Sequence, residues 1–98
     1  MTIDALISSL SHAQPPQGIS KLLQALWHDA KNNWDAAHDI AQDIETADGS
    51  WIHAYLHRKE GDSGNAAYWY RRAGKAVPNI SLETEWKDIA TELLKEKG

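Results

Sequence analysis

The stretch that decides the fold spans residues 51–74 and reads WIHAYLHRKEGDSGNAAYWYRRAG. It contains two tryptophans, two histidines and all three tyrosines of the chain. The Gly-Asp-Ser-Gly run at 61–64 is a strong turn signal, because glycine reaches backbone angles closed to other residues while Asp and Ser bond to the nearby backbone. The stretch therefore predicts two helices joined by a tight turn, the first over 51–60 and the second beginning at Ser63.

Outward from this hairpin, apolar residues recur at the three-and-four spacing of a helical face. The prolines at 15 and 16 interrupt the pattern, since proline cannot continue a helix. The second helix of the hairpin directs Val77 to the core and ends before Pro78. No stretch alternates with the period of two that is typical of a strand, so we predict an all-α fold. The expected helices cover residues 3–11, 21–31, 34–46, 51–60, 63–77 and 81–97, with N-caps at Ser20, Asn33, Ser50 and Ser63, and the last helix starts at Ser81.

The chain has 98 residues, which is enough for one domain and too few for two. With 42% hydrophobic and 24% charged residues, its composition is that of an ordinary globular protein. We interpret residues 1–98 as a single domain made of two hairpins and two terminal segments. These are a loosely docked arm at 1–18 with a short N-terminal helix, hairpins at 19–48 and 50–78, and a C-terminal capping helix at 81–97.

The net charge of −4 is unevenly distributed along the chain. Residues 50–80 hold five Lys and Arg against two acidic residues, whereas residues 1–49 hold two against seven. A cationic middle could bind an anion or could face its own acidic neighbours. Nucleic-acid binding is not expected for an acidic chain with so short a basic segment. The absence of cysteine excludes disulfides and thiolate sites, and the lack of a long apolar run or a secretion signal predicts a cytoplasmic protein without a membrane span.

A weak internal repeat appears when the chain is shifted by 29 residues, because ALWH at 25–28 then lies over AYLH at 54–57. The second copy has small residues, a turn glycine, an aromatic and a closing proline at a characteristic spacing, and they are Ala54, Gly61, Ala66, Tyr70, Ala73 and Pro78; in the first copy Ala25 and Ala37 agree, and Trp34 and Ala41 agree more loosely. At these positions the chain resembles the tetratricopeptide repeat family, although the offset is shorter than that family's usual ~34 residues. The resemblance covers residues 19–78 and implies stacked helical hairpins with a terminal cap. Residues 53–62 and 65–73 are also similar to a stretch of small uncharacterised bacterial helical proteins.

Two histidines stand out because His53 and His57, four residues apart, project from one helix face at the spacing of a metal-binding pair. A third ligand would have to come from His28, which the repeat places on the neighbouring hairpin, or from Glu60. Buried histidines that bond to neighbouring groups are commoner than metal sites. We therefore expect no metal and no cofactor, and we keep a small-ligand or metal-binding protein using His28, His53 and His57 as the alternative function.

The leading hypothesis concerns the cationic segment. Tyr68 is expected to lie off the core stripe of its helix beside cationic side chains, a setting that suits recognition of a carboxylate or a phosphate. An equally acceptable interpretation is a surface tyrosine packed on arginine stems. No phosphate-binding loop or nucleophile motif occurs, so we expect no enzyme but a module that binds an acidic protein or peptide, or a second copy of itself. The predicted binding residues are Arg58, Tyr68, Arg71, Arg72 and Lys75.

Overall fold

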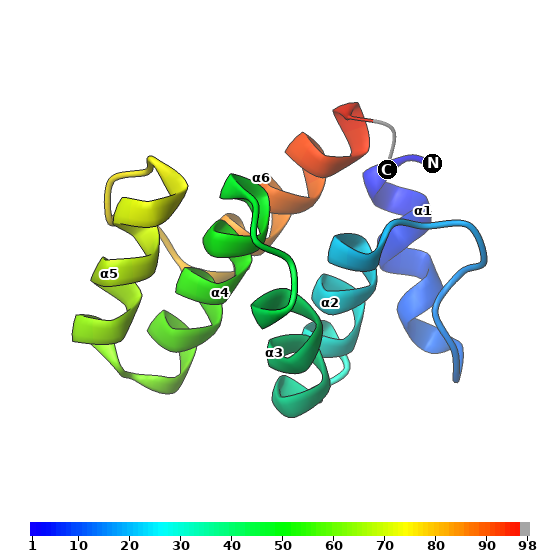
Figure 1. The fold of residues 1–98 in the computed structure, drawn as a ribbon. Coiled ribbons are helices and arrows are strands. Elements are labelled where there is room, and N and C mark those ends of the chain that lie inside the picture. The colour runs from blue at the N-terminus through cyan, green and yellow to red at the C-terminus, as the bar shows by residue number, and fades with distance from the viewer. Residues whose placement is uncertain (97–98) are drawn as a thin grey trace.

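A computed structural model describes residues 1–96 as an all-helical fold of six α-helices and one 3₁₀ turn, with no strand in this part of the chain. Figure 1 shows α5, α4, α3 and α2 side by side, with α1 at one end and α6 lying across α4 and α2. The all-α prediction is confirmed. The elements are α1 (Ile3–Ser8), η1 (Ser9–Ser11), α2 (Lys21–Ala30), α3 (Trp34–Gln42), α4 (Ala47–Glu60), α5 (Ser63–Ala73) and α6 (Leu82–Lys95).

Each helix begins at a side-chain cap that satisfies a free backbone N–H group. Ser20 and Asn33 cap α2 and α3 as predicted, and Ser81, where the last helix was expected to start, is the N-cap of α6. The other two predicted caps are wrong. Thr46 caps α4 by accepting a hydrogen bond from the Gly49 amide, and Asp62 caps α5.

The helix bounds also differ from the prediction: residues 3–11 form α1 followed by the 3₁₀ turn η1, and the predicted end of the last helix at residue 97 lies outside the described residues. α3 ends at Gln42, and α4 already begins at Ala47, so Gly49 lies inside a helix where the sequence predicted a break. α5 ends at Ala73 because Gly74 takes a left-handed conformation with φ of 72°. Val77 is 59% exposed and does not belong to the core.

The helices form two antiparallel pairs, α2 with α3 and α4 with α5. α4 is central, because it also contacts α2, α3 and α6. This explains why it carries few exposed residues and lacks a clear polar face: every residue from Gly49 to His57 is buried. Ala54 and Ala66 are buried on the paired helices α4 and α5. Three tryptophans, Trp27, Trp51 and Trp86, fill the core, while Trp34 is half-buried at its edge.

The N-terminal segment is joined to this core through α1. Leu6 is fully buried, and the Trp27 indole N–H donates to the Ser9 hydroxyl over 3.2 Å. Lys31 Nζ donates to the backbone oxygens of Leu10 and His12. The α1 part of residues 1–18 is therefore packed, whereas most of residues 11–18 are exposed. None of the helices described for residues 1–96 has the length and apolar character needed to cross a bilayer.

Candidate functional site

The two cations of α4 bind buried carboxylates. Arg58 Nη1 donates to Glu85 Oε1 over 2.8 Å, and Nη2 donates to the backbone oxygen of Ile80. Glu85 is only 2% exposed and also accepts the Tyr70 hydroxyl over 2.6 Å. Arg58 therefore connects α4 to α6, and this engagement removes it from the predicted binding face.

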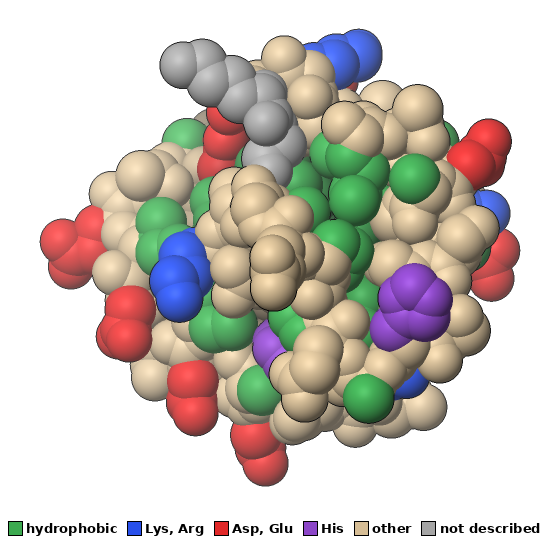
Figure 2. All heavy atoms as spheres, turned by 90° about the vertical axis from the view of Figure 1, so that its right-hand side faces the viewer, with side chains coloured by type: hydrophobic (Ala, Val, Ile, Leu, Met, Phe, Trp, Pro, Cys, Tyr) green, Lys and Arg blue, Asp and Glu red, His purple; other side chains and the backbone are tan. Residues whose placement is uncertain are grey.

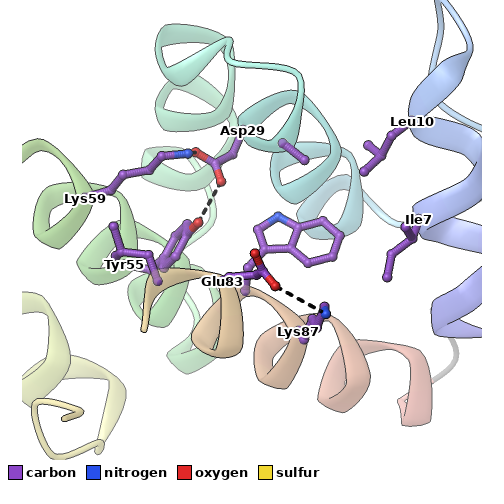
Figure 3. A pocket seen from close by; sticks show the side chains of 10 residues that line it. Ile7, Leu10, Asp29, Tyr55, Lys59, Glu83 and Lys87 are labelled. Carbon is purple, nitrogen blue, oxygen red and sulfur yellow. Dashed lines mark hydrogen bonds and ion pairs between the residues drawn. The ribbon is translucent and has the colours of Figure 1, made fainter. Parts of the chain in front are cut away.

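A second buried carboxylate is satisfied in the same way. Asp29, 2% exposed, accepts Lys59 Nζ and the Tyr55 hydroxyl, each over 2.9 Å. Figure 3 shows these three side chains at one end of a groove of about 470 Å³ bounded by α1, α2 and α6. Burial and the neighbouring carboxylates raise the pKa of Tyr55 and of Tyr70 well above the usual value of 10. Both phenols therefore remain hydrogen-bond donors throughout the neutral range.

The cations of α5 have a different environment. Tyr68 is 44% exposed and accepts Arg72 Nη1 over 3.1 Å. The Arg72 guanidinium lies 5.2 Å from the Trp69 ring, and Lys75 Nζ lies 4.1 Å from the Trp51 ring. Arg71 is exposed. Among residues 1–96, no carboxylate forms an ion pair with Arg71, Arg72 or Lys75. We call Tyr68, Arg71, Arg72 and Lys75 the α5 surface.

The opposite end of the molecule differs in character. Figure 2 shows the side formed by α1, where hydrophobic side chains gather in a central band and acidic side chains lie around it. Ile7 and Met1 are the exposed large apolar residues of this end. The structure thus separates a cationic surface at α5 from an apolar and acidic one at α1.

Three histidines meet between α3 and α4, and they are His38, His53 and His57. The Nε2 atoms of His38 and His53 are 3.0 Å apart, and the His57 ring lies 5.2 Å from that of His38 and 4.8 Å from that of His53. His57 Nδ1 lies 2.6 Å from Glu60 Oε2. We call these three residues the histidine cluster.

His28, which the sequence proposed as the third member, lies elsewhere. It is half-buried on α2, where its ring packs edge-on against Trp27 at 5.3 Å. The internal repeat aligns His28 with His57 as equivalent positions, but the ring that lies against His53 and His57 is that of His38 on α3. The sequence did contain an indication that His38 belongs to the cluster, because His38 follows Trp34 by four residues and therefore lies on the same face of its helix.

Burial lowers the pKa of two of the three rings of the histidine cluster. Burial, together with the neighbouring histidines, lowers the pKa of His53 to about 4. The pKa of His38 is also lowered, first by burial and then by His57. A neutral imidazole has one nitrogen with a free lone pair, which is the form that ligates a metal.

Comparisons with known proteins supply no relative. No protein-family model, curated protein or solved structure matches this chain. What the structure establishes is a compact all-helical fold of six α-helices over residues 1–96, and the candidate sites depend on their own geometry.

Proposed function

We propose that this chain is a non-catalytic interaction module whose α5 surface binds an acidic peptide segment of a partner protein. The helical hairpin that presents this surface, α4 with α5, is the part that resembles a tetratricopeptide repeat. The repeat-like stacking of two hairpins is part of the same proposal.

One observation carries the proposal, and it is the contrast between the cations of α4 and those of α5. Arg58 and Lys59 are held by Glu85 and Asp29, so their charges are compensated within the fold. The cations of the α5 surface have no such carboxylate within ion-pair distance in the described chain. An exposed group of positive charges that forms no ion pair with an acidic side chain of residues 1–96 attracts an anionic partner.

The partner's chemistry follows from the side chains present. Arg71 and Arg72 can each bind a carboxylate through two N–H groups, and the Tyr68 ring offers a half-exposed apolar surface beside them. A segment with acidic side chains and an apolar or aromatic residue between them fits this arrangement.

A second copy of the chain is the other acidic partner that the structure offers. α3 exposes Asp35 and Asp39, and Asp43 follows at its C-cap, on a segment that holds no exposed cation. Association of α5 of one copy with α3 of another would use the same charges. We favour a peptide partner, because the exposed Tyr68 ring can make an apolar contact that the carboxylates of α3 would leave unused.

A charge-reversal experiment tests the proposal. The double variant Arg71→Glu with Arg72→Glu is compared with Lys87→Glu with Lys95→Glu on α6, which changes the net charge equally. Fluorescence anisotropy with a labelled Glu- and Tyr-containing peptide measures binding, and sedimentation velocity measures self-association. We expect wild-type binding to weaken as salt rises from about 50 mM to about 500 mM, because screening shortens the reach of exposed charges.

The two double variants should differ in peptide binding. The α5 variant should lose binding while circular dichroism and melting stay unchanged, and the α6 variant should retain it. Equal loss in both variants, or no salt dependence, would show that the α5 surface does not recognise an acidic segment.

A further inference from the structure

We propose that the histidine cluster is a binding site for a divalent transition metal of the Zn²⁺ type, with one ring nitrogen each from His38, His53 and His57. This site uses no residue of the α5 surface, although Trp69 lies between His53 and Arg72, and it does not depend on the function proposed for that surface. The sequence placed two histidines on one face and predicted no metal. His38 changes that expectation by supplying a third nitrogen.

The distances between the histidine nitrogens are short enough for one metal ion to bind all three rings with little movement of the side chains. The ligand atoms of the three histidines all lie within 4.8 Å of one another. Two nitrogens bound to one tetrahedral zinc are about 3.3 Å apart, given Zn–N bonds of ~2.0–2.1 Å. The 3.0 Å between the Nε2 atoms of His38 and His53 is close to this value. At this distance one of the two rings donates its Nε2–H to the other, and on metal binding that ring would carry its proton on Nδ1 instead, so that both Nε2 lone pairs face the metal.

Neighbouring side chains fix the three rings in place. The His38 ring stacks on Trp34 at 4.7 Å with an interplanar angle of 11°, and the His53 ring stacks on Trp69 at 4.0 Å with an angle of 20°. Trp34 is itself anchored, because its indole N–H donates to the Leu56 backbone oxygen over 2.9 Å. Ligands held in this way lose little freedom on binding, which favours affinity.

Glu60 gives His57 the orientation of a metal ligand. Its carboxylate lies 2.6 Å from His57 Nδ1 and can accept the proton carried there. That tautomer leaves the Nε2 lone pair free. A carboxylate behind a ligating histidine is the usual arrangement in zinc proteins, since it orients the ring and raises its basicity. Glu60 is therefore a positioning residue for the site.

One buried polar atom of the cluster has no partner in the described part of the fold. His53 Nδ1 has no hydrogen-bond partner among residues 1–96, although His53 is only 6% exposed. Such atoms are rare in folded proteins, and an ion or water is one of the accepted reasons for them. Ligation of a metal through His53 Nε2 would place the ring proton on Nδ1, which makes this atom a hydrogen-bond donor.

The chemistry of the ligand set selects the class of metal. Three imidazole nitrogens suit Zn²⁺, Ni²⁺, Co²⁺ and Cu²⁺, and do not suit Mg²⁺ or Ca²⁺, which prefer oxygen. A cavity of about 110 Å³ borders His53 on the side of Trp69, and Gln42, Glu45, Ser50 and Arg72 are among its other lining residues.

Isothermal titration of chelator-treated protein with Zn²⁺ tests the proposal, and Mg²⁺ serves as the metal control. Wild type should bind one Zn²⁺ with a Kd below ~10 μM and should not bind Mg²⁺. His38→Gln should weaken Zn²⁺ binding at least ~100-fold, and Glu60→Ala should weaken it by ~10–100-fold as expected for an orienting carboxylate. His28→Gln is the matched control, because His28 lies outside the cluster, and it should bind within about twofold of wild type.

Two further measurements keep the result interpretable. His38 is half-buried, so His38→Gln should retain wild-type circular dichroism. NMR of ¹⁵N-histidine-labelled wild type, which needs no variant, should show Zn²⁺-induced shifts at three imidazoles and none at His12 or His28. No saturable binding, equal loss in His28→Gln, or imidazole shifts confined to His12 or His28 would overturn the proposal.

Discussion

Arg58 is paired with the buried Glu85, so we predict that its removal destabilises the fold. This cost distinguishes a structural cation from a cation that is available to a partner. Replacing Arg58 by Met keeps most of the apolar stem and removes the charge. The Glu85 carboxylate then stays buried with only the Tyr70 hydroxyl as donor. Removing one member of a buried pair costs about 3–5 kcal/mol. Because the Arg58 side chain is 23% exposed, solvent screens part of the interaction and we expect the lower value, about 3 kcal/mol.

Urea unfolding followed by circular dichroism measures this cost, and a double-mutant cycle assigns it to the pair. Arg71→Met is the matched control on the exposed face of α5 and should change the free energy of unfolding by less than about 0.5 kcal/mol. In the cycle, Glu85→Gln removes the charge that Arg58 compensates. The double variant should therefore be more stable than the sum of the single effects predicts, by roughly 2 kcal/mol.

A cost below about 1 kcal/mol for Arg58→Met, or equal costs for Arg58→Met and Arg71→Met, would refute the reasoning. Either result would mean that Arg58 is not held by the fold. It would then return to the group of cations that a partner could engage, as the sequence first suggested.

Three further predictions concern packing, backbone and pH. Ala66→Leu should overpack the contact between α4 and α5 and lower the free energy of unfolding by ~1–3 kcal/mol in a urea titration; no measurable change would contradict this packing. Gly49→Ala should lower the free energy of unfolding by at least as much, because the added Cβ would lie 2.0 Å from the backbone oxygen of Ile44. Gly64→Ala on α5 is the control: its Cβ meets no atom within 4 Å, so it should raise the free energy of unfolding by roughly 0.5–1 kcal/mol. At alkaline pH the unfolded phenols lose protons near pH 10 while Tyr55 and Tyr70 keep theirs, so these two residues should leave the stability unchanged below that pH and lower it above that pH. Absorbance at 295 nm recorded with circular dichroism checks this, and ionisation of all phenols without unfolding would contradict it.

The helices could be predicted from the sequence because their signals are local. The periodicity of the apolar residues and the caps Ser20, Asn33 and Ser81 depend on residues only a few positions apart. The start of α4 could not be predicted in this way. Gly49 and Ser50 resemble a break, yet they continue the helix because Gly49 packs against the backbone of Ile44, where no larger residue fits.

The candidate sites were harder to predict from the sequence, because they depend on which helices become neighbours in the fold. The sequence showed that Arg58 was cationic, but only the packing of α6 on α4 reveals that Glu85 is its partner, 27 residues away. His53 and His57 could be paired from their spacing on one helix. The choice of His38 over His28 required knowing that α3, and not α2, brings its ring to that face of α4.

The central claim is that the α5 surface recognises an acidic segment, and an NMR titration tests it most directly. ¹⁵N-labelled wild-type protein is titrated with the Glu- and Tyr-containing peptide, and backbone amide shifts are mapped onto the fold. We predict that the largest shifts fall at residues 68–75 and diminish when salt is added. Shifts concentrated at the groove beside Leu10 and Trp86, or no saturable shifts at all, would contradict the claim.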